Sequence, residues 1–286
     1  MRLLTVQTET GPRACGLLEG RYVDLNAADP LLPSNVREIL AMGDDGRKRA
    51  EQALAKGRVQ YAPESTTLHA PICDPRKIVC VGLNYRDHAA ESGVEPPCEP
   101  VLFSKFATTL IGYGGTILLP SVSQEVDYEA ELVIVIGKAG RDIAQKDAFG
   151  HVAGYTIGHD VSARDWQLQK PGKQWLAGKT FDTFAPMGPA LVTADEVENP
   201  HDLRIQLRLN GKTMQDSNTS QFIFGVDVVV SYISQIVTLE PGDLIFTGTP
   251  PGVGAARKPP VWLQPGDVVE VEIDGLGMLR NPVARR

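Results

Sequence analysis

Cysteine is scarce in this sequence: Cys15, Cys73, Cys80 and Cys98 are its four thiol residues among 286. They form no Cys-x-x-Cys pair, and although four cysteines are enough for two disulfides, nothing in their spacing indicates a disulfide framework. Histidine is also sparse, and its five positions lack the His-x-x-x-His spacing that is typical of zinc enzymes. We therefore expect free thiols in a reducing compartment.

Long apolar runs are missing as well. The longest of them, such as residues 132–136, are far shorter than the roughly 20 residues that a membrane-spanning helix needs. Residues 1–7 are too short an apolar run for a signal peptide, and polar residues follow them. The sequence therefore predicts a protein with no membrane partner and no targeting segment, located in the cytoplasm.

The chain also lacks an excess of positive charge. It has 28 Lys and Arg residues against 35 Asp and Glu residues, which gives a net charge of -7 and an isoelectric point near 5.3. An acidic protein repels phosphate backbones, which argues against nucleic acid as a partner. The acidity does not exclude an anionic substrate, because a bound cation reverses the local field.

Two common catalytic motifs are absent from the sequence. Five residues separate Gly172 from Gly178, whereas a phosphate-binding loop needs four between its glycines. Ser162 and the other serines do not lie in the Gly-x-Ser-x-Gly motif of serine hydrolases. The sequence therefore predicts neither a nucleotide-binding loop nor a serine nucleophile.

The organisation of the chain indicates a small and a large domain. Residues 1–70 combine short strands with one amphipathic helix over 36–55, which predicts a small N-terminal α/β domain. Residues 71–286 are rich in strands, and the clearest helix among them covers 227–237. We expect this second part to be the catalytic domain, with a strand-rich α+β fold instead of alternating βαβ units.

The segment of residues 126–136 carries the clearest chemical signal. Its apolar run predicts a strand buried on both faces, and strand alternation places Glu129 and Glu131 on the same face. Burying an unpaired charge costs roughly several kcal/mol, which a shared proton, basic partners or a hard divalent cation would offset. Spacing alone leaves a second interpretation open, in which both glutamates face solvent at a strand end.

Two further segments contain charged residues that fit either a role in catalysis or a purely structural role. Asp160 follows an apolar, strand-like segment, where it is either a ligand or the cap of a following helix, with Ser162 as another cap. Residues 84–93 predict a short helix, capped by Asn84 and ended by Gly93, that brings His88 and Glu91 onto one face. A carboxylate beside an imidazole suits a general base, although a surface pair has the same spacing.

The remaining candidates are a lysine and a loop. Lys179 is either a cation that stabilises developing negative charge or an exposed surface residue. The loop of residues 248–254 follows a strand and is either a rigid turn or an anion site formed by backbone amides and the Thr249 hydroxyl.

In this order, the segments resemble the fumarylacetoacetate hydrolase superfamily over residues 77–283. The matching motifs are Gly-Leu-Asn-Tyr-x-x-His-Ala-x-Glu at 82–91, Asp-Tyr-Glu-x-Glu-Leu at 127–132, His-Asp-Val-Ser-Ala-Arg-Asp-Trp-Gln at 159–167, Gly-Lys-Thr-Phe-Asp-Thr-Phe-Ala-Pro-Met-Gly-Pro at 178–189 and Thr-Gly-Thr-Pro-Pro-Gly-Val-Gly at 247–254. Two more segments, at 172–176 and 258–261, resemble one branch of this superfamily. One difference is His159, where many members have Asn.

This resemblance implies a rolled mixed β-sandwich, often described as barrel-like, with a smaller N-terminal part. It implies a homodimer that binds Mg²⁺, with Mn²⁺ or Ca²⁺ as alternatives. The implied metal ligands are Glu129, Glu131 and Asp160, and the implied lid is the helix at 84–92. The implied catalytic residues are His88, Glu91 and Lys179, and the implied substrate contacts are Arg164, Gln167 and Thr249.

The substrate implied by the resemblance is a small 2-oxo acid. We expect hydrolysis of a carbon–carbon bond in a 2,4-dioxo acid of the acylpyruvate type, in which the metal absorbs the charge of the departing enolate. The same site also suits an oxaloacetate tautomerase or decarboxylase, or an isomerase or decarboxylase of unsaturated dioxo acids from aromatic catabolism. A more distant alternative is an inactive, metal-bound scaffold.

Overall fold

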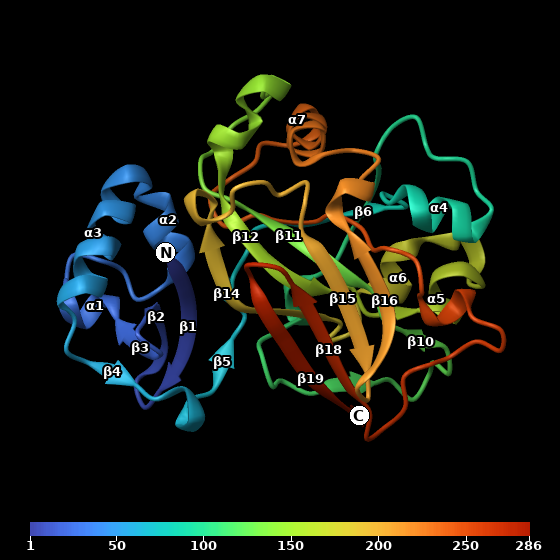
Figure 1. The fold of residues 1–286 in the computed structure, drawn as a ribbon, viewed down its shortest axis with the longest axis horizontal. Helices are drawn as coiled ribbons and strands as arrows, with labels where there is room; N and C mark the ends of the chain where they lie inside the picture. The colour runs from blue at the N-terminus through green and yellow to red at the C-terminus, as the bar shows by residue number, and fades with distance from the viewer.

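The computed structural model of the protein describes residues 1–286, with Ser92 described for its backbone only. Most strands belong to one large mixed sheet, and a smaller sheet packs in front of it (Figure 1). The large sheet has twelve strands, in the order β4 (Gln60–Tyr61), β3 (Arg21–Asp24), β2 (Gly11–Leu18), β1 (Arg2–Thr8), β14 (Ala185–Thr193), β12 (Val152–His159), β11 (Ala130–Ile136), β17 (Leu244–Phe246), β6 (Ile78–Gly82) and β7 (Val101–Ser104), with β5 (Leu68–His69) on β1 and β8 (Leu110–Ile111) on β14.

The second sheet is mostly antiparallel and comes largely from the C-terminal part of the chain. Its five strands are β16 (Lys212–Asn218), β15 (Arg204–Leu209), β18 (Val268–Ile273), β19 (Gly277–Arg285) and β9 (Ile117–Leu119). A two-stranded sheet of β10 (Val126–Asp127) and β13 (Ser162–Ala163) completes the set. The strand-rich α+β fold is therefore confirmed, and across residues 1–286 the sheets stay open instead of closing into a barrel.

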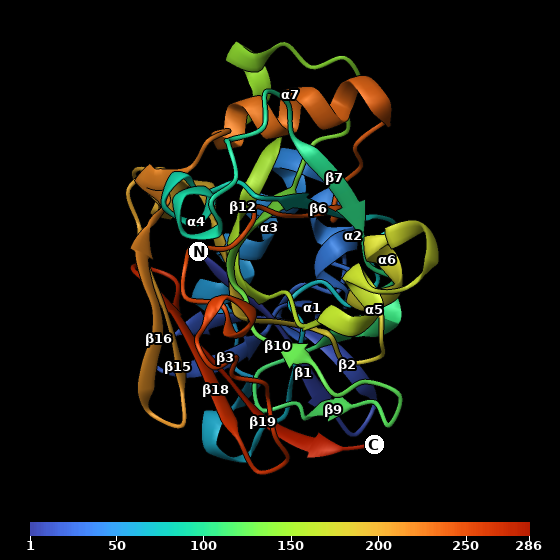
Figure 2. The ribbon, with the colours of Figure 1, turned by 90° about the vertical axis from the view of Figure 1, so that its right-hand side faces the viewer.

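The helices occupy separate regions of the molecule. They are α1 (Leu25–Ala28), α2 (Val36–Ala41), α3 (Gly43–Lys56), α4 (Arg86–Ser92), α5 (Arg164–Leu168), α6 (Trp175–Lys179) and α7 (Val226–Ile236). Figure 1 shows α1, α2 and α3 beside the N-terminal strands, and Figure 2 shows α7 crossing one end of the molecule while α4, α5 and α6 flank the strands below it. In the described chain, no helix combines the length and apolar character that crossing a membrane requires.

Strand β11 lies at the centre of the fold and is buried along its whole length. Leu132 and Ile134 pack into the core shared with the five-stranded sheet, and Val133 and Val135 pack into the core on the opposite face. A strand covered on both faces has no polar side to present, which explains its continuous apolar run. The prediction of a doubly buried strand is therefore confirmed.

The N-terminal part of the chain differs from the prediction in one respect. The single helix expected over residues 36–55 is wrong, because the structure divides this segment into α2 and α3. Gly43 begins α3 with a φ of 61°, in the left-handed region that favours glycine, and this turns the chain between the two helices. Strand β1 pairs with β14 of the larger part, and the boundary near residue 70 stays a prediction.

Candidate active site

Three carboxylates meet where β11 and β12 lie side by side. Glu131 lies in β11, Glu129 directly precedes this strand, and Asp160 directly follows β12. The Asp160 N–H donates to the carbonyl of Glu129 at 2.9 Å, which fixes the register of the two chain segments. Carboxylate oxygens of the three residues lie within 4.8 Å of one another, and all three residues are buried. The structure thus excludes the solvent-facing interpretation of the glutamates.

The alternative role of Asp160 as a helix cap is also wrong. The following helix, α5, begins at Arg164, and Ala163 precedes it without a capping side chain. The Ser162 hydroxyl donates to the carbonyl of Asp160 at 3.1 Å and caps no helix either. The Asp160 carboxylate is therefore free to face the other two.

Two buried lysines neutralise part of this cluster. The Lys179 ammonium donates to Glu129 Oε2 at 2.6 Å and to Asp160 Oδ2 at 2.8 Å. The Lys105 ammonium donates to the other oxygen of Asp160. Lys179 is 2% exposed, so the interpretation of this residue as an exposed surface lysine is wrong.

A guanidinium group completes the ring of cations. Arg164 donates to Glu129 Oε1 at 2.6 Å and to Asp127 Oδ2 at 2.8 Å. A third nitrogen of the same group donates to the Gln167 side-chain oxygen at 2.9 Å. Two of the three predicted substrate contacts, Arg164 and Gln167, therefore lie beside the carboxylates and are linked to each other.

The environment makes the two glutamates electrostatically different. Burial by itself would raise the pKa of Glu129, but the charges of Lys179 and Arg164 outweigh burial and lower this pKa to about 2. Burial raises the pKa of Glu131 well above its usual value, and the charges of Asp160 and Glu129 raise it further. Among the described residues, ion pairs join cationic side chains to Glu129 and Asp160 but not to Glu131.

The donor set fits a hard divalent cation. Three carboxylates offer the oxygen ligands that Mg²⁺, Mn²⁺ and Ca²⁺ prefer, and the hydrogen bond recorded for the Glu131 carboxylate is a single one, from the Gly248 N–H at 2.8 Å. When ionised, Asp127 and the three carboxylates of the cluster carry four negative charges. Lys105, Lys179 and Arg164 carry three positive charges, so the net charge of the site would be -1. A divalent cation would make the site positive by one charge, which suits an anionic substrate.

Helix α4 brings the predicted His and Glu pair together and joins it to the 248–254 loop. His88 Nδ1 lies 3.2 Å from Glu91 Oε2. The same carboxylate accepts the Gly252 N–H at 3.0 and 3.1 Å from its two oxygens. Gly93 ends the helix with a φ of 63°, as expected for a left-handed terminus.

The predicted cap at the start of α4 is wrong. The helix begins one residue later than expected, after Tyr85, and Asn84 makes no capping bond. The buried Asn84 side chain instead donates to the carbonyl of Thr247 at 2.8 Å and accepts the Phe224 N–H at 2.8 Å. It therefore ties the base of α4 to the strand end that precedes the 248–254 loop.

The 248–254 loop is held by a residue that the sequence analysis did not identify. Gln215 of β16 donates to the Thr249 hydroxyl oxygen at 2.8 Å and to the Pro250 carbonyl at 2.7 Å. Its side-chain oxygen accepts the Ala130 N–H at 2.9 Å. Thr249 thus lies on a loop fixed directly to the start of β11.

Lys105 and Asp127 were also missed. Asp127 lies two residues before Glu129 in the same motif, so alternation along the strand could have indicated its position. Lys105 is separated from Asp160 by 55 residues and lies outside the matching motifs, so no local pattern indicated it. A lysine buried to 3% exposure beside a metal-ligand candidate is visible only in three dimensions.

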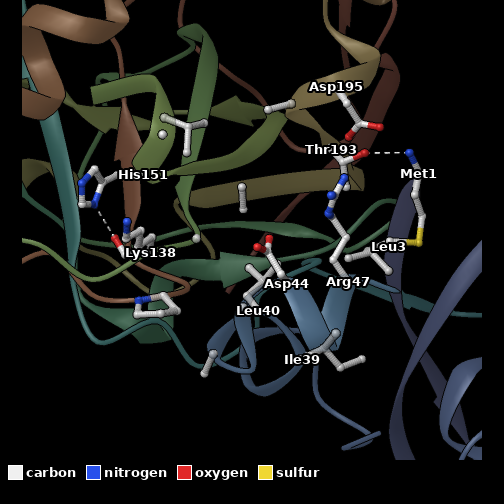
Figure 3. Close-up of a pocket in the computed structure, with 18 of the residues that line it drawn as sticks. Met1, Leu3, Ile39, Leu40, Asp44, Arg47, Lys138, His151, Thr193 and Asp195 are labelled. Carbon is white, nitrogen blue, oxygen red and sulfur yellow. Dashed lines mark hydrogen bonds between the residues drawn. The ribbon is translucent and has the colours of Figure 1, made fainter. Parts of the chain in front are cut away.

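A separate hollow in the structure lies away from these residues. It has a volume of about 670 Å³ and lies between α2, α3 and the ends of β11 and β12 that are remote from the carboxylates. Figure 3 shows Asp44, Arg47, Lys138 and His151 among its lining residues. Glu131 and Gly137 at the rim are six positions apart along extended chain, a length of about 20 Å. None of the predicted site residues lines it.

Comparisons with known proteins agree with the geometry. The family model for fumarylacetoacetate hydrolase, C-terminal, matches residues 77–284. The oxaloacetate tautomerase fahd2, mitochondrial, of Xenopus laevis is 51% identical over 99% of this chain and 90% of its own length. A putative HpcE protein from Mycobacterium smegmatis has a TM-score of 0.91 and 38% identity, covering 100% of this chain and 99% of its own.

A further solved structure is informative about the site. The maleylpyruvate hydrolase from Sphingobium sp., solved in complex with manganese(II) ion and pyruvate, has a TM-score of 0.83 and 30% identity, covering 100% of this chain and 99% of its own. That structure holds a divalent metal and a 2-oxo acid in a protein of this fold.

The comparisons correct one expectation from the sequence. Relatives about half identical to this chain are named as mitochondrial proteins, so the expectation of a cytoplasmic location is contradicted. That expectation depended on composition and on the absence of a recognisable leader, and neither reports the compartment of the mature protein.

The branch expected from the motifs at 172–176 and 258–261 is that of the fumarylacetoacetate hydrolase domain-containing protein 2, and this prediction is confirmed. The family match over residues 77–284, the relatives at about 50% identity and the buried acidic cluster lead to one conclusion: the chain is an enzyme of the fumarylacetoacetate hydrolase family.

Proposed function

We propose that this enzyme interconverts the keto and enol forms of oxaloacetate and depends on a divalent metal, with Mg²⁺ as the expected ion. The observation that carries the proposal is the buried cluster of Glu129, Glu131 and Asp160. The 248–254 loop links this cluster to the His88–Glu91 pair, because the Gly248 N–H donates to Glu131 and the Gly252 N–H donates to Glu91. The names of relatives that are 51% identical to this chain support the choice of reaction over the hydrolysis expected first from the sequence.

Glu129, Glu131 and Asp160 would hold the metal, which supplies Lewis acidity toward the 2-oxo oxygen. The chain's own cations add to the positive field on the substrate side. The Lys179 ammonium and the Arg164 guanidinium each contact Glu129, so they would add positive charge near an oxygen on which negative charge develops. Gln167 and Thr249 would orient the substrate by hydrogen bonds.

His88 would carry the proton between the two reacting atoms. Because Glu91 accepts a hydrogen bond from Nδ1–H, the lone pair of His88 lies on Nε2, which can act as a base. Nε2 removes a proton from C3, the C2–C3 double bond forms as the carbonyl π bond opens, and the same proton then passes to the oxygen on C2. The reaction consumes no water, and atoms and charge balance.

The same site supports a second function, hydrolysis of a 2,4-dioxo acid. A structural relative at 30% identity is named as a maleylpyruvate hydrolase. In that reaction His88 would remove a proton from water, which attacks the 4-carbonyl, while Lys179 and Gln167 stabilise the oxyanion. The two functions share the metal site and differ in whether water reaches the substrate.

The test is a direct comparison of the two reactions. Purified protein with Mg²⁺ is assayed for the decay of enol-oxaloacetate and for cleavage of acetylpyruvate, each before and after chelation. We expect rapid ketonisation that chelation abolishes. No acceleration of the oxaloacetate reaction, or a rate that chelation leaves unchanged, would refute the proposal, and cleavage of acetylpyruvate alone would establish the second function.

We also propose a homodimer, which light scattering on the purified protein would test. Independence from membranes and nucleic acid stays a prediction from the composition.

A further inference from the structure

The carboxylate of Glu91 is bound from two sides. His88 Nδ1 lies 3.2 Å from Glu91 Oε2, and the Gly252 N–H points at both carboxylate oxygens from 3.0 and 3.1 Å. Glu91 therefore docks the lid helix α4 onto the 248–254 loop at one backbone amide. A charge-assisted hydrogen bond of this kind fixes both the position of α4 and the orientation of the imidazole.

Hydrogen bonds also hold the carbonyl group of Gly252. The Tyr128 hydroxyl donates to it at 3.3 Å, and Arg257 Nε donates to it at 3.2 Å. Arg257 Nε also lies 3.1 Å from the Tyr128 hydroxyl, and another of its nitrogens donates to the Met214 carbonyl of β16. We refer to Tyr128 and Arg257 as the Gly252 clamp.

Gly252 needs such a clamp because of its backbone. Its φ is 101°, in the region that residues with a side chain rarely adopt, and a Cβ would lie 2.1 Å from the Met214 carbonyl oxygen. Only glycine fits, yet glycine is also the residue whose peptide groups rotate most freely. Fixing its carbonyl restricts that rotation and keeps its N–H directed at Glu91.

The clamp also connects α4 to the chain segment that carries Glu129 and Glu131, two of the candidate metal ligands. Tyr128 directly precedes Glu129, and its ring is fully buried. Within the described residues, the acceptors recorded for Arg257 are the neutral oxygens of Tyr128, Gly252 and Met214. Arg257 therefore positions these three groups instead of forming a surface ion pair, because its planar guanidinium holds three oxygens in a fixed geometry.

We propose that Arg257, with Tyr128, is a positioning residue that sets the orientation of the His88–Glu91 pair through Gly252. The kinetic part of this inference rests on the proposed function. Arg257 touches no reacting atom in this scheme. It acts by holding the amide on which the lid docks, and so it raises the fraction of enzyme in which the His88 base faces the substrate.

The test compares R257M with R204M. Arg204 of β15 is a matched control. It donates two hydrogen bonds to Asp216 at the surface of the five-stranded sheet, which also contains Met214, the residue bonded by Arg257. Loss of the clamp should lower kcat for oxaloacetate by about tenfold to a hundredfold, the equivalent of one hydrogen bond to a charged group. Binding of oxalate in the presence of Mg²⁺ should stay within about twofold of wild type, the usual limit for an uncoupled site. R204M should match wild type in both assays.

A double-variant cycle separates positioning from direct contact. If Arg257 acts through Glu91, R257M should lower kcat by less than about twofold once E91Q is present. If R257M lowers kcat by the same factor with and without E91Q, Arg257 contacts the substrate itself, and the inference is overturned. Equal loss of oxalate binding, or R257M activity equal to that of R204M, would overturn it too. R257K should recover only part of the rate, because an ammonium lacks the fork.

Amide hydrogen exchange tests the inference without relying on enzyme activity. Amides of residues 86–93 should exchange faster in R257M than in wild type when both carry Mg²⁺ and oxalate, while amides of β11 stay unchanged. Unchanged exchange in α4 would refute the clamp. If wild type does not turn over oxaloacetate but α4 exchange still rises in R257M, the proposed function fails and the clamp stands.

Discussion

Removal of the Lys105 ammonium should make the stability of the protein depend on the metal. Its ammonium is buried, contacts Asp160 Oδ1 and donates to the Val161 carbonyl at 3.1 Å. Burial lowers the pKa of Lys105, and the charge of Asp160 acts in the opposite direction. K105M keeps the volume of the side chain and removes its charge, so one oxygen of a buried carboxylate loses its partner.

The expected cost can be worked out from the contacts. Removing one partner of a buried ion pair costs about 3–5 kcal/mol. Asp160 keeps Lys179 on its other oxygen, at 2.8 Å, so we expect the lower end of this range, about 3 kcal/mol. For a chain of this size, Tm should fall by about 6–12 °C when the protein is free of metal.

Bound metal should recover much of this loss. A divalent cation beside Asp160 supplies the positive charge that K105M lacks, and ligands that bind only the folded state raise its stability. Thermal unfolding is measured with and without saturating Mg²⁺ in wild type, K105M and the control K212M, which removes an exposed lysine of β16. The Mg²⁺-induced rise in Tm should be larger in K105M than in the other two. A metal-free Tm equal to that of K212M, or an equal Mg²⁺ shift in all three, would refute the electrostatic reasoning.

Three further predictions concern the base, a ligand and the N-terminal region. H88A should lower kcat by about 10²–10⁴-fold and leave Mg²⁺-dependent oxalate binding intact; full activity in steady-state assays would exclude His88 as the base. E131Q should abolish the Mg²⁺-induced rise in Tm, and calorimetry showing wild-type Mg²⁺ affinity would remove Glu131 from the ligand set. Burial opposes a low pKa for Asp24, but bonds from Arg13 and the Ala27 N–H lower it overall, so its stabilising effect is present above about pH 4 and is lost as pH falls through the folded pKa. Urea unfolding between pH 2 and 5, roughly the range of carboxylate titration, should show a weaker pH dependence in D24N, and identical slopes would contradict this assignment.

Local patterns predicted the parts of the fold that depend on neighbours in sequence. The alternation around Glu129 and Glu131 predicted their common face, because a strand has a fixed period of two. The apolar run that follows predicted burial on both sides, and Gly93 predicted the end of α4. Each of these properties follows from a few consecutive residues.

Contacts between distant segments were beyond such patterns. Asn84 has the chemistry of a helix cap, yet its amide binds Thr247 and Phe224, which lie 163 and 140 residues away. Lys105 approaches Asp160 only because β6 and β7 carry it there. The motifs indicated Asp160 as a ligand by resemblance, whereas its spacing alone favoured a cap. Tertiary structure therefore determined the partner of each polar group.

The pairing of β1 with β14 has a consequence for shortened forms of the protein. Strand β14 is bonded on its other side to β12, which leads directly to Asp160. A chain that began after residue 70 would leave one edge of β14 without its long partner and would expose the apolar face that Ile39 and Leu3 now cover. Exposed edges of this kind pair with other molecules and promote aggregation. An insoluble C-terminal fragment would therefore reflect an uncovered sheet edge, and would say nothing about whether its carboxylates can bind metal.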